Sequence, residues 1–255
     1  MNKKIIIGNW KMNPRTAKEA EKLFGNISQN LSRTKKTDIV ICAPLIYLSE
    51  LAKIRTSKVK LGAQDAFWGD IGAFTGEVSG EMLYNMGVRY VILGHSESRA
   101  LGENNADISK KIKSSLEAGL RPILCVGESE RDQNHEFFDF VKTELKECLS
   151  GISQNSISKV IVAYEPIWAI SSTPERRDAT AGDALEMAIF IRKALTLKFG
   201  EEARKMRVIY GGSVDEEDAE DFLKNGGVDG LLPGRASLDA EKFSEIVKIC
   251  EALGK

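Results

Sequence analysis

Residues 122–149 read PILCVGESERDQNHEFFDFVKTELKECL. An apolar run over 122–127 is followed, after a polar stretch, by an amphipathic pattern over 136–149. The run is typical of a parallel strand buried on both faces, and the pattern after it is typical of a helix that packs on such a sheet. The stretch therefore predicts one strand–helix unit, with His135 at the start of the helix.

The same alternation recurs along the whole chain. Short apolar runs occupy residues 5–10, 38–43, 59–64, 90–94, 122–127, 159–165, 207–211 and 228–232. Helical patterns lie at 16–31, 106–118, 136–149, 182–199, 215–224 and 240–253. Eight units in 255 residues match a closed (β/α)8 barrel better than an open doubly wound sheet of five or six strands. No GxGxxG turn follows the first run, so we expect an α/β protein with one barrel domain over residues 1–255.

Composition excludes several classes of protein. Hydrophobic residues make up 42% and charged residues 29%, which is typical of a globular chain and excludes disordered, collagen-like and disulfide-scaffold proteins. The 36 Lys and Arg residues nearly cancel the 37 Asp and Glu residues, for a net charge of −1. Binding to nucleic acid or to an anionic membrane surface is therefore not expected, and any recognition of an anion has to be local. The expected partner is a small molecule.

The cysteines and the first residues indicate the compartment. The four cysteines lie far apart without a CxxC pair, which favours reduced thiols over disulfides or a zinc site: Cys42, Cys125, Cys148 and Cys250. The opening MNKKIIIGNW contains an apolar run too short for a signal-peptide core or a membrane span. A cytoplasmic location is expected.

The carboxyl ends of the predicted strands carry the candidate catalytic side chains, because a closed barrel brings these ends to one rim. Glu165 ends an apolar run and precedes Pro166, so partial desolvation of a stiffly held carboxylate would suit proton abstraction; a solvated strand cap is the alternative. His95 precedes a predicted helical turn, whose dipole would keep the imidazole neutral and able to polarise a carbonyl; a core histidine is the alternative. Lys11 points either inward at an anion or outward to water.

Glycines after the last two strands indicate a phosphate site. Gly211, Gly212 and Ser213 follow the seventh run, and Gly234 follows the eighth. Backbone N–H groups at these places commonly hold phosphate in barrels of this kind, and glycine permits close approach.

Four motifs, in the same order along the chain, resemble the triosephosphate isomerase family: GNWKMN at 8–13, GHSESR at 94–99, AYEPIWAI at 163–170 and YGGSV at 210–214. The stretch GAFTGE at 72–77 is similar to the family's dimer loop. The resemblance covers nearly the whole chain. It implies a TIM barrel that interconverts dihydroxyacetone phosphate and D-glyceraldehyde 3-phosphate through an enediolate, in glycolysis and gluconeogenesis, without metal or cofactor.

The resemblance also implies the roles of individual residues. Glu165 would move the proton and His95 would hydrogen-bond the substrate oxygens. Lys11 and Asn9 would stabilise negative charge and the phosphate, while Glu97 would orient Lys11. The phosphate would also meet Ser171, Ser213, Gly234 and Arg235.

Two departures from the family's pattern affect the phosphate end. The lid reads SSTPERRDAT over 171–180 in place of a Gly-Thr-Gly start. If residues 180–183 form its far hinge, the lid is about three residues longer than usual; if residues 173–175 do, it is about four shorter. The first alignment is preferred because it keeps the helix at 182–199 intact. Arg235 replaces a usual glycine, and we expect its side chain to lean outward along the rim towards acidic groups while its N–H meets phosphate. Ser98 also replaces a usual arginine.

Two other functions share these features. One is an isomerase of a four-carbon sugar phosphate with the same mechanism, and the other is a non-catalytic phosphate-binding barrel. A homodimer is expected, because the long connection at 65–79 contains Phe67, Trp68, Ile71 and Phe74, apolar surface that a monomer would expose. The resemblance places Thr75 near the partner's Asn9 and the partner's Lys11.

Overall fold

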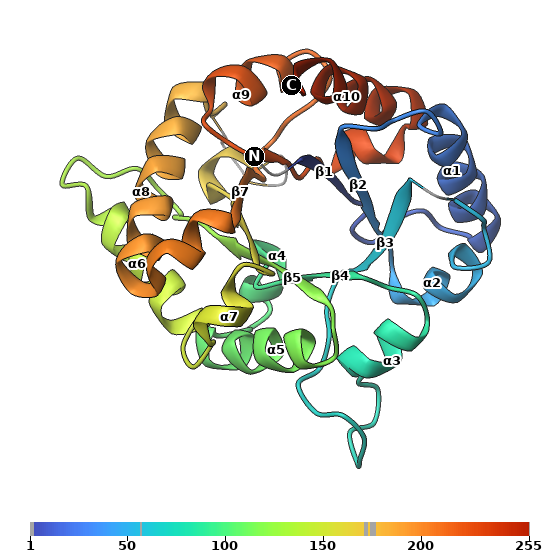
Figure 1. Cartoon of the computed structure of the whole chain (residues 1–255), viewed down its shortest axis with the longest axis horizontal. Coiled ribbons are helices and arrows are strands. Elements are labelled where there is room, and N and C mark those ends of the chain that lie inside the picture. Colours follow the sequence, from blue (N-terminus) through green and yellow to red (C-terminus); the bar gives the residue numbers. More distant parts are fainter. Residues whose placement is uncertain (1–2, 57, 171–172, 174–176, 255) are drawn as a thin grey trace.

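The computed structural model describes residues 3–56, 58–170, 173 and 177–254. Eight parallel strands close into a barrel, because β1 pairs with β2 on one side and with β8 on the other. Figure 1 looks down the barrel and shows the helices in a ring around it. The strands are β1 (Lys4–Asn9), β2 (Thr37–Cys42), β3 (Val59–Ala63), β4 (Tyr90–Leu93), β5 (Arg121–Val126), β6 (Ile161–Tyr164), β7 (Arg207–Tyr210) and β8 (Gly230–Leu231). The predicted fold is confirmed.

The strands are mostly apolar because most of their residues are buried on both faces of the sheet. In β1, Ile5 and Ile7 belong to a cluster inside the barrel, together with Ile123 and Cys125 of β5. Ile6 faces the other way and packs in the larger cluster between the barrel and the helices. This alternation is the two-residue period of a strand.

The longer helices lie where the amphipathic patterns predict them. They are α1 (Ala17–Asn30), α5 (Asn105–Glu117), α6 (Glu136–Cys148), α8 (Ala181–Phe199), α9 (Ala219–Asn225) and α10 (Ala240–Leu253). His135 is the N-cap residue of α6, as predicted. The expected start of α9 at residue 215 is wrong by four residues, because the Asp215 carboxylate accepts from the Glu217 N–H and the chain turns over 216–218 before the helix begins.

Several short helical segments were not predicted. They are α2 (Leu45–Leu51), α3 (Gly80–Asn85), α4 (Ser96–Ala100) and α7 (Gln154–Ile157), with 3₁₀ turns η1 (Ile167–Ala169), η2 (Gly200–Lys205) and η3 (Arg235–Leu238). Each is too short to show a helical period; for α4 the sequence indicated only one turn. None of the described helices has both the length and the apolar character that crossing a bilayer requires.

The far end of the lid is marked by the start of α8. Thr180 is the N-cap residue, and its side chain accepts from the Asp183 N–H while the Asp183 carboxylate accepts from the Thr180 N–H. This capping box begins α8 next to the predicted helix start and supports the alignment with the longer lid. Ser171, Ser172 and residues 174–176 of the lid lie outside the described residues.

Candidate active site

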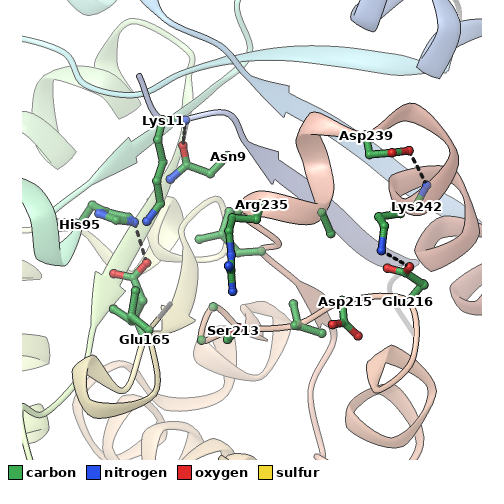
Figure 2. Close-up of a pocket in the computed structure, with 17 residues that line it drawn as sticks. Asn9, Lys11, His95, Glu165, Ser213, Asp215, Glu216, Arg235, Asp239 and Lys242 are labelled. Atoms are coloured by element: carbon green, nitrogen blue, oxygen red, sulfur yellow. Dashed lines mark hydrogen bonds and ion pairs between the residues drawn. The ribbon is translucent and has the colours of Figure 1, made fainter. Parts of the chain in front are cut away.

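The carboxyl ends of the strands surround a cavity of about 440 Å³. Asn9, Lys11, His95 and Glu165 lie on its wall, with Ser213, Gly234 and Arg235. Figure 2 shows His95 and Glu165 beside one another, with the Lys11 side chain extending towards them. The barrel therefore brings together candidate residues from β1, β4, β6, β7 and β8, as expected. Ser171 is the one candidate outside the described residues.

Glu165 and His95 form a hydrogen-bonded pair. The His95 Nε2 atom lies 2.9 Å from Glu165 Oε1, and the Ser96 N–H donates to Glu165 Oε2 at 3.2 Å. His95 is the N-cap residue of α4, and its Nδ1 accepts from the Glu97 N–H at 3.2 Å. Because Nδ1 accepts, Nε2 is the nitrogen that donates to Glu165. The predicted contact between the ring and a helix start is confirmed.

The pairing changes the expected basicity of Glu165. Burial alone pushes the pKa of Glu165 upward, but the attraction and hydrogen bond from His95 outweigh it and hold that pKa below its ordinary value. Burial lowers the pKa of His95, and Glu165 outweighs that effect and raises it. The Glu97 N–H acts against imidazolium, because a protonated Nδ1 has no lone pair to accept with. The expectation that desolvation raises the pKa of Glu165 is therefore wrong for this structure, in which His95 donates a hydrogen bond to Glu165.

Lys11 is held by three polar contacts. Its backbone has a φ of 50°, a left-handed conformation that is uncommon outside glycine. The Lys11 N–H donates to Asn9 Oδ1 at 3.0 Å, and Gln64 Nε2 donates to the Lys11 carbonyl at 2.9 Å. The ammonium lies 2.6 Å from Glu97 Oε1, which is the contact the resemblance implies. In the sequence Gln64 is only the last residue of a predicted strand. It reaches the Lys11 carbonyl past the end of β2, which lies between β3 and β1.

The phosphate end of the cavity differs in two ways from the expectation. The Ser213 N–H donates to the Ala169 carbonyl at 3.2 Å, whereas the N–H groups of Gly212, Gly234 and Arg235 donate to no acceptor in the described residues. The Arg235 side chain is exposed but lines the cavity and extends over it (Figure 2). No carboxylate among the described residues pairs with it. The outward orientation predicted for this side chain is therefore wrong.

Four charged residues at the far end of the cavity were not singled out from the sequence. Lys242 pairs with Glu216, and the Asp239 carboxylate caps α10 by accepting from the N–H groups of Glu241 and Lys242. Asp215 also lines this end. The only sequence signal was the N-cap position of Asp239, which predicts a helix start and says nothing about a cavity.

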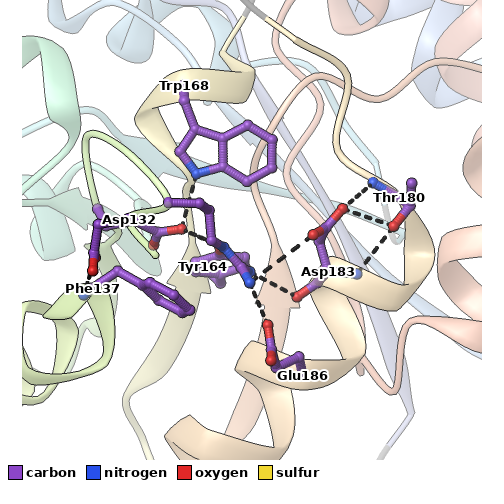
Figure 3. A network of polar contacts seen from close by, with 9 residues as sticks. Asp132, Phe137, Tyr164, Trp168, Thr180, Asp183 and Glu186 are labelled. Carbon is purple, nitrogen blue, oxygen red and sulfur yellow. Dashed lines mark hydrogen bonds and ion pairs between the residues drawn. The ribbon is translucent and has the colours of Figure 1, made fainter. Parts of the chain in front are cut away.

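The buried carboxylate of Glu128 belongs to a polar network that joins residues on either side of the lid; Figure 3 shows Tyr164, Trp168 and Asp183 of this network. Glu128 Oε1 accepts from Trp168 Nε1 at 2.9 Å and from the Tyr164 hydroxyl at 2.8 Å. Arg131 donates to the same oxygen at 3.1 Å and also to the Asp183 carbonyl at 3.3 Å. Trp168 precedes the lid and Asp183 follows it, so the network connects the two ends of the lid and holds them in place relative to one another. Local sequence could not reveal it, because its members come from β5, β6 and α8.

The connection over 65–79 projects away from the barrel next to α3 in Figure 1. Ile71 is 82% exposed and Phe74 48% exposed, as expected for this connection. Phe67 and Trp68 are less exposed and are half-buried, because their rings pack on one another and the Phe67 ring also packs on Phe74. Thr75 is exposed at the same end.

The described residues contain no group of three or more His, Cys, Asp or Glu side chains suited to hold a metal ion. All four cysteines are buried free thiols.

The sequence and the fold both match known proteins. The family model described as triosephosphate isomerase matches residues 4–250. The triosephosphate isomerase of Moorella thermoacetica is 42% identical over 251 residues, which cover 97% of this chain and 98% of that protein. The triosephosphate isomerase of Aquifex aeolicus is 41% identical over 249 residues, covering 96% and 98%. The crystal structure of triosephosphate isomerase from Bartonella henselae superposes with a TM-score of 0.85 at 33% identity, covering 97% of this chain and 98% of that one.

Proposed function

Because the chain belongs to the triosephosphate isomerase family, we propose that Glu165, His95, Lys11 and Asn9 carry out its reaction. That reaction is the interconversion of dihydroxyacetone phosphate and D-glyceraldehyde 3-phosphate, an aldose–ketose isomerisation of glycolysis. The observation that supports the assignment of residues most strongly is the 2.9 Å pair of His95 Nε2 and Glu165 Oε1 on the wall of the cavity. It provides a base and a hydrogen-bond donor side by side.

Substrate binding would break this pair. A substrate oxygen near His95 Nε2 competes with Glu165 for the same proton, so His95 turns its N–H to the carbonyl. Glu165 then loses its main stabilising donor while it stays buried, and the pKa of its carboxyl rises towards that of an effective base. The carboxylate removes a proton from one carbon and returns it to the neighbouring carbon.

The negative charge of the enediolate would meet fixed donors. His95 Nε2 and the Lys11 ammonium would both donate to the oxygens of the reacting carbons, and Glu97 and Asn9 hold Lys11 in place. Preorganised donors of this kind stabilise a developing oxyanion in a water-poor cavity. The phosphate would lie at the free N–H groups of Gly234 and Arg235, with Ser213 and Ser171 beside it.

The test is a coupled assay on glyceraldehyde 3-phosphate with wild type and Glu165→Gln. The variant keeps the size of the side chain and loses the base, so kcat falls by about 10²- to 10⁴-fold. Binding of glycerol 3-phosphate, which has no carbonyl, changes by less than about threefold. Near-wild-type turnover would rule out Glu165 as the base. No observation favours a four-carbon substrate or a non-catalytic barrel.

We also propose that the protein is a cytoplasmic homodimer and that residues 1–255 form one domain. The pairing of β1 with β8 supports one domain, and the buried free thiols fit a reducing compartment. The exposed apolar side chains of the 65–79 connection support burial against a second subunit, with Thr75 near the partner's Lys11. Sedimentation of wild type and Thr75→Arg tests the dimer: wild type sediments as a dimer, and the added charge shifts the variant towards an inactive monomer. A fully active wild-type monomer would contradict the proposal.

A further inference from the structure

Most charged side chains on the cavity wall already have a partner. Among the cations, Lys11 is paired with Glu97 and Lys242 with Glu216. Glu165 is paired with His95. Arg235 differs from them, because its guanidinium has no ion pair or hydrogen bond within the described part of the chain.

The carboxylates of Asp215, Glu216 and Asp239, which line the same end of the cavity, do not pair with Arg235, and each contacts another group. Asp215 Oδ1 accepts from the Glu217 N–H at 3.0 Å, and Asp239 Oδ1 accepts from the Glu241 N–H at 2.8 Å. Glu216 is held by Lys242. The Arg235 guanidinium is consequently an unmatched positive charge with five N–H donors that extends over the cavity (Figure 2).

The backbone next to Arg235 brings it close to the catalytic lysine. A side chain at Gly234 would place its Cβ 3.6 Å from Lys11 Cε, so the Lys11 stem passes directly over this glycine. The Lys11 ammonium lies 2.6 Å from Glu97 Oε1, and the Arg235 side chain extends towards Ser213 (Figure 2). Two cations thus face different parts of one small cavity, with Lys11 at the reacting end beside His95 and Arg235 at the end with the free N–H groups.

We propose that the Arg235 side chain binds the phosphate of the substrate directly, in addition to the backbone N–H groups around it. The planar guanidinium matches two phosphate oxygens at once, which a lysine or a backbone N–H cannot do. This inference rests on the proposed function for its substrate, a phosphate monoester, and it adds a binding residue where the resemblance implies only a backbone contact. It reverses the expectation that the side chain leans away.

Binding by Arg235 has a definite kinetic consequence. The phosphate is remote from the carbons that exchange the proton, so the contact holds the bound substrate and the transition state about equally. Loss of such uniform binding raises KM and leaves kcat nearly unchanged. A charge-assisted hydrogen bond to phosphate corresponds to about 10- to 100-fold in affinity.

The test measures two quantities in wild type, Arg235→Gly and Arg235→Gln. The first is the dissociation constant of inorganic phosphate by titration calorimetry, and the second is KM and kcat for glyceraldehyde 3-phosphate. Arg204→Gln is the matched control: Arg204 is an exposed arginine of η2, which precedes β7 and lies at the opposite rim of the barrel. Thermal unfolding of each variant establishes that it is folded.

We expect both Arg235 variants to bind phosphate and substrate about 10- to 100-fold more weakly with kcat within about threefold of wild type, and Arg204→Gln to match wild type. Phosphate binding and KM within about twofold of wild type in both Arg235 variants would overturn the proposal, as would an equal loss in Arg204→Gln. The phosphate titration needs no turnover. If wild type binds phosphate through Arg235 but does not isomerise the substrate, only the proposed function fails.

Discussion

The position of Glu165 depends on a glycine in the neighbouring strand. Gly127 follows β5, and a Cβ atom at this residue would lie 2.1 Å from the Glu165 carbonyl oxygen and 2.5 Å from its carbon. The two strand ends are also tied together, because the Glu165 N–H donates to the Val126 carbonyl at 2.8 Å. Gly127→Ala therefore has to push the backbone of Glu165 away from β5.

The size of the displacement follows from these contacts. Real Cβ atoms essentially never approach another heavy atom closer than 3.0 Å, so the gap has to widen from 2.1 Å to at least that distance. Both atoms are backbone and cannot rotate away. Misplacing a catalytic group by about 1 Å lowers the rate by about 10²-fold. Overpacking of this kind destabilises by about 1–3 kcal/mol, and each kcal/mol lowers Tm by about 2–4 °C in a protein of this size.

Gly25→Ala provides the matched control. Gly25 lies inside α1, and a Cβ there would meet nothing within 4 Å. Alanine is the better helix former by about 0.5–1 kcal/mol, so this variant is expected to be slightly more stable with unchanged kcat. Steady-state kinetics and thermal unfolding of both variants make the comparison. If Gly127→Ala kept the kcat and Tm of wild type, close approach of β5 and β6 would not be what positions Glu165.

Three further predictions concern the polar contacts of the site. Glu97→Gln weakens the 2.6 Å contact between Glu97 and Lys11. Because both side chains are partly exposed, we expect Tm to change by less than about 2 °C, while kcat/KM falls about 10- to 100-fold. Unchanged kcat/KM would contradict a positioning role for Glu97. Trp168→Phe removes one donor from buried Glu128, whose Oε2 has no hydrogen-bond partner among the described residues, so the free energy of unfolding falls by about 1–3 kcal/mol in denaturant titrations. No change would show that the network is dispensable for stability. Folding lowers the pKa of Glu165 from its ordinary 4.5, so its contribution to folding stability is present above about pH 4.5 and is lost as pH falls through the folded-state pKa. Folding raises the pKa of His95 from its ordinary 6.5, so its contribution is present below about pH 6.5 and is lost as pH rises through the folded-state pKa. The Tm difference between wild type and Glu165→Gln should therefore be larger near pH 5.5 than near pH 8.5, and equal differences would refute the pairing.

Much of the architecture could be predicted because the apolar sequence of a barrel strand indicates that the strand is buried. The strands are covered by helices outside and by opposite strands inside, so most of their residues are apolar, as in Ile5–Ile7 of β1. The candidate residues Asn9, His95 and Glu165 could be grouped for a related reason. Each lies at the carboxyl end of such a run or directly after it, and closure of the barrel carries the ends of all the runs to the same rim.

The motif resemblance contributed what periodicity alone left open. From local sequence, Lys11 could point to an anion or to water and His95 could be a core residue. The ordered motifs selected the catalytic interpretation, and the structure then placed Lys11 against Glu97 and His95 against Glu165.

The sequence by itself therefore determined the order of strands and helices, the closed barrel and the rim on which the candidate residues meet, because these follow from short-range patterns of burial. Only the tertiary structure decided which charges neutralise one another. Glu165 lies 70 residues from His95 in the chain, and its pKa depends on a contact that no local pattern encodes. The sequence-based expectation that Arg235 leans outward was wrong for the same reason: the carboxylates at this end of the cavity contact other groups, and the Arg235 side chain lines the cavity. Electrostatic interactions act across space between separate strands, so they appear only once the chain has closed on itself.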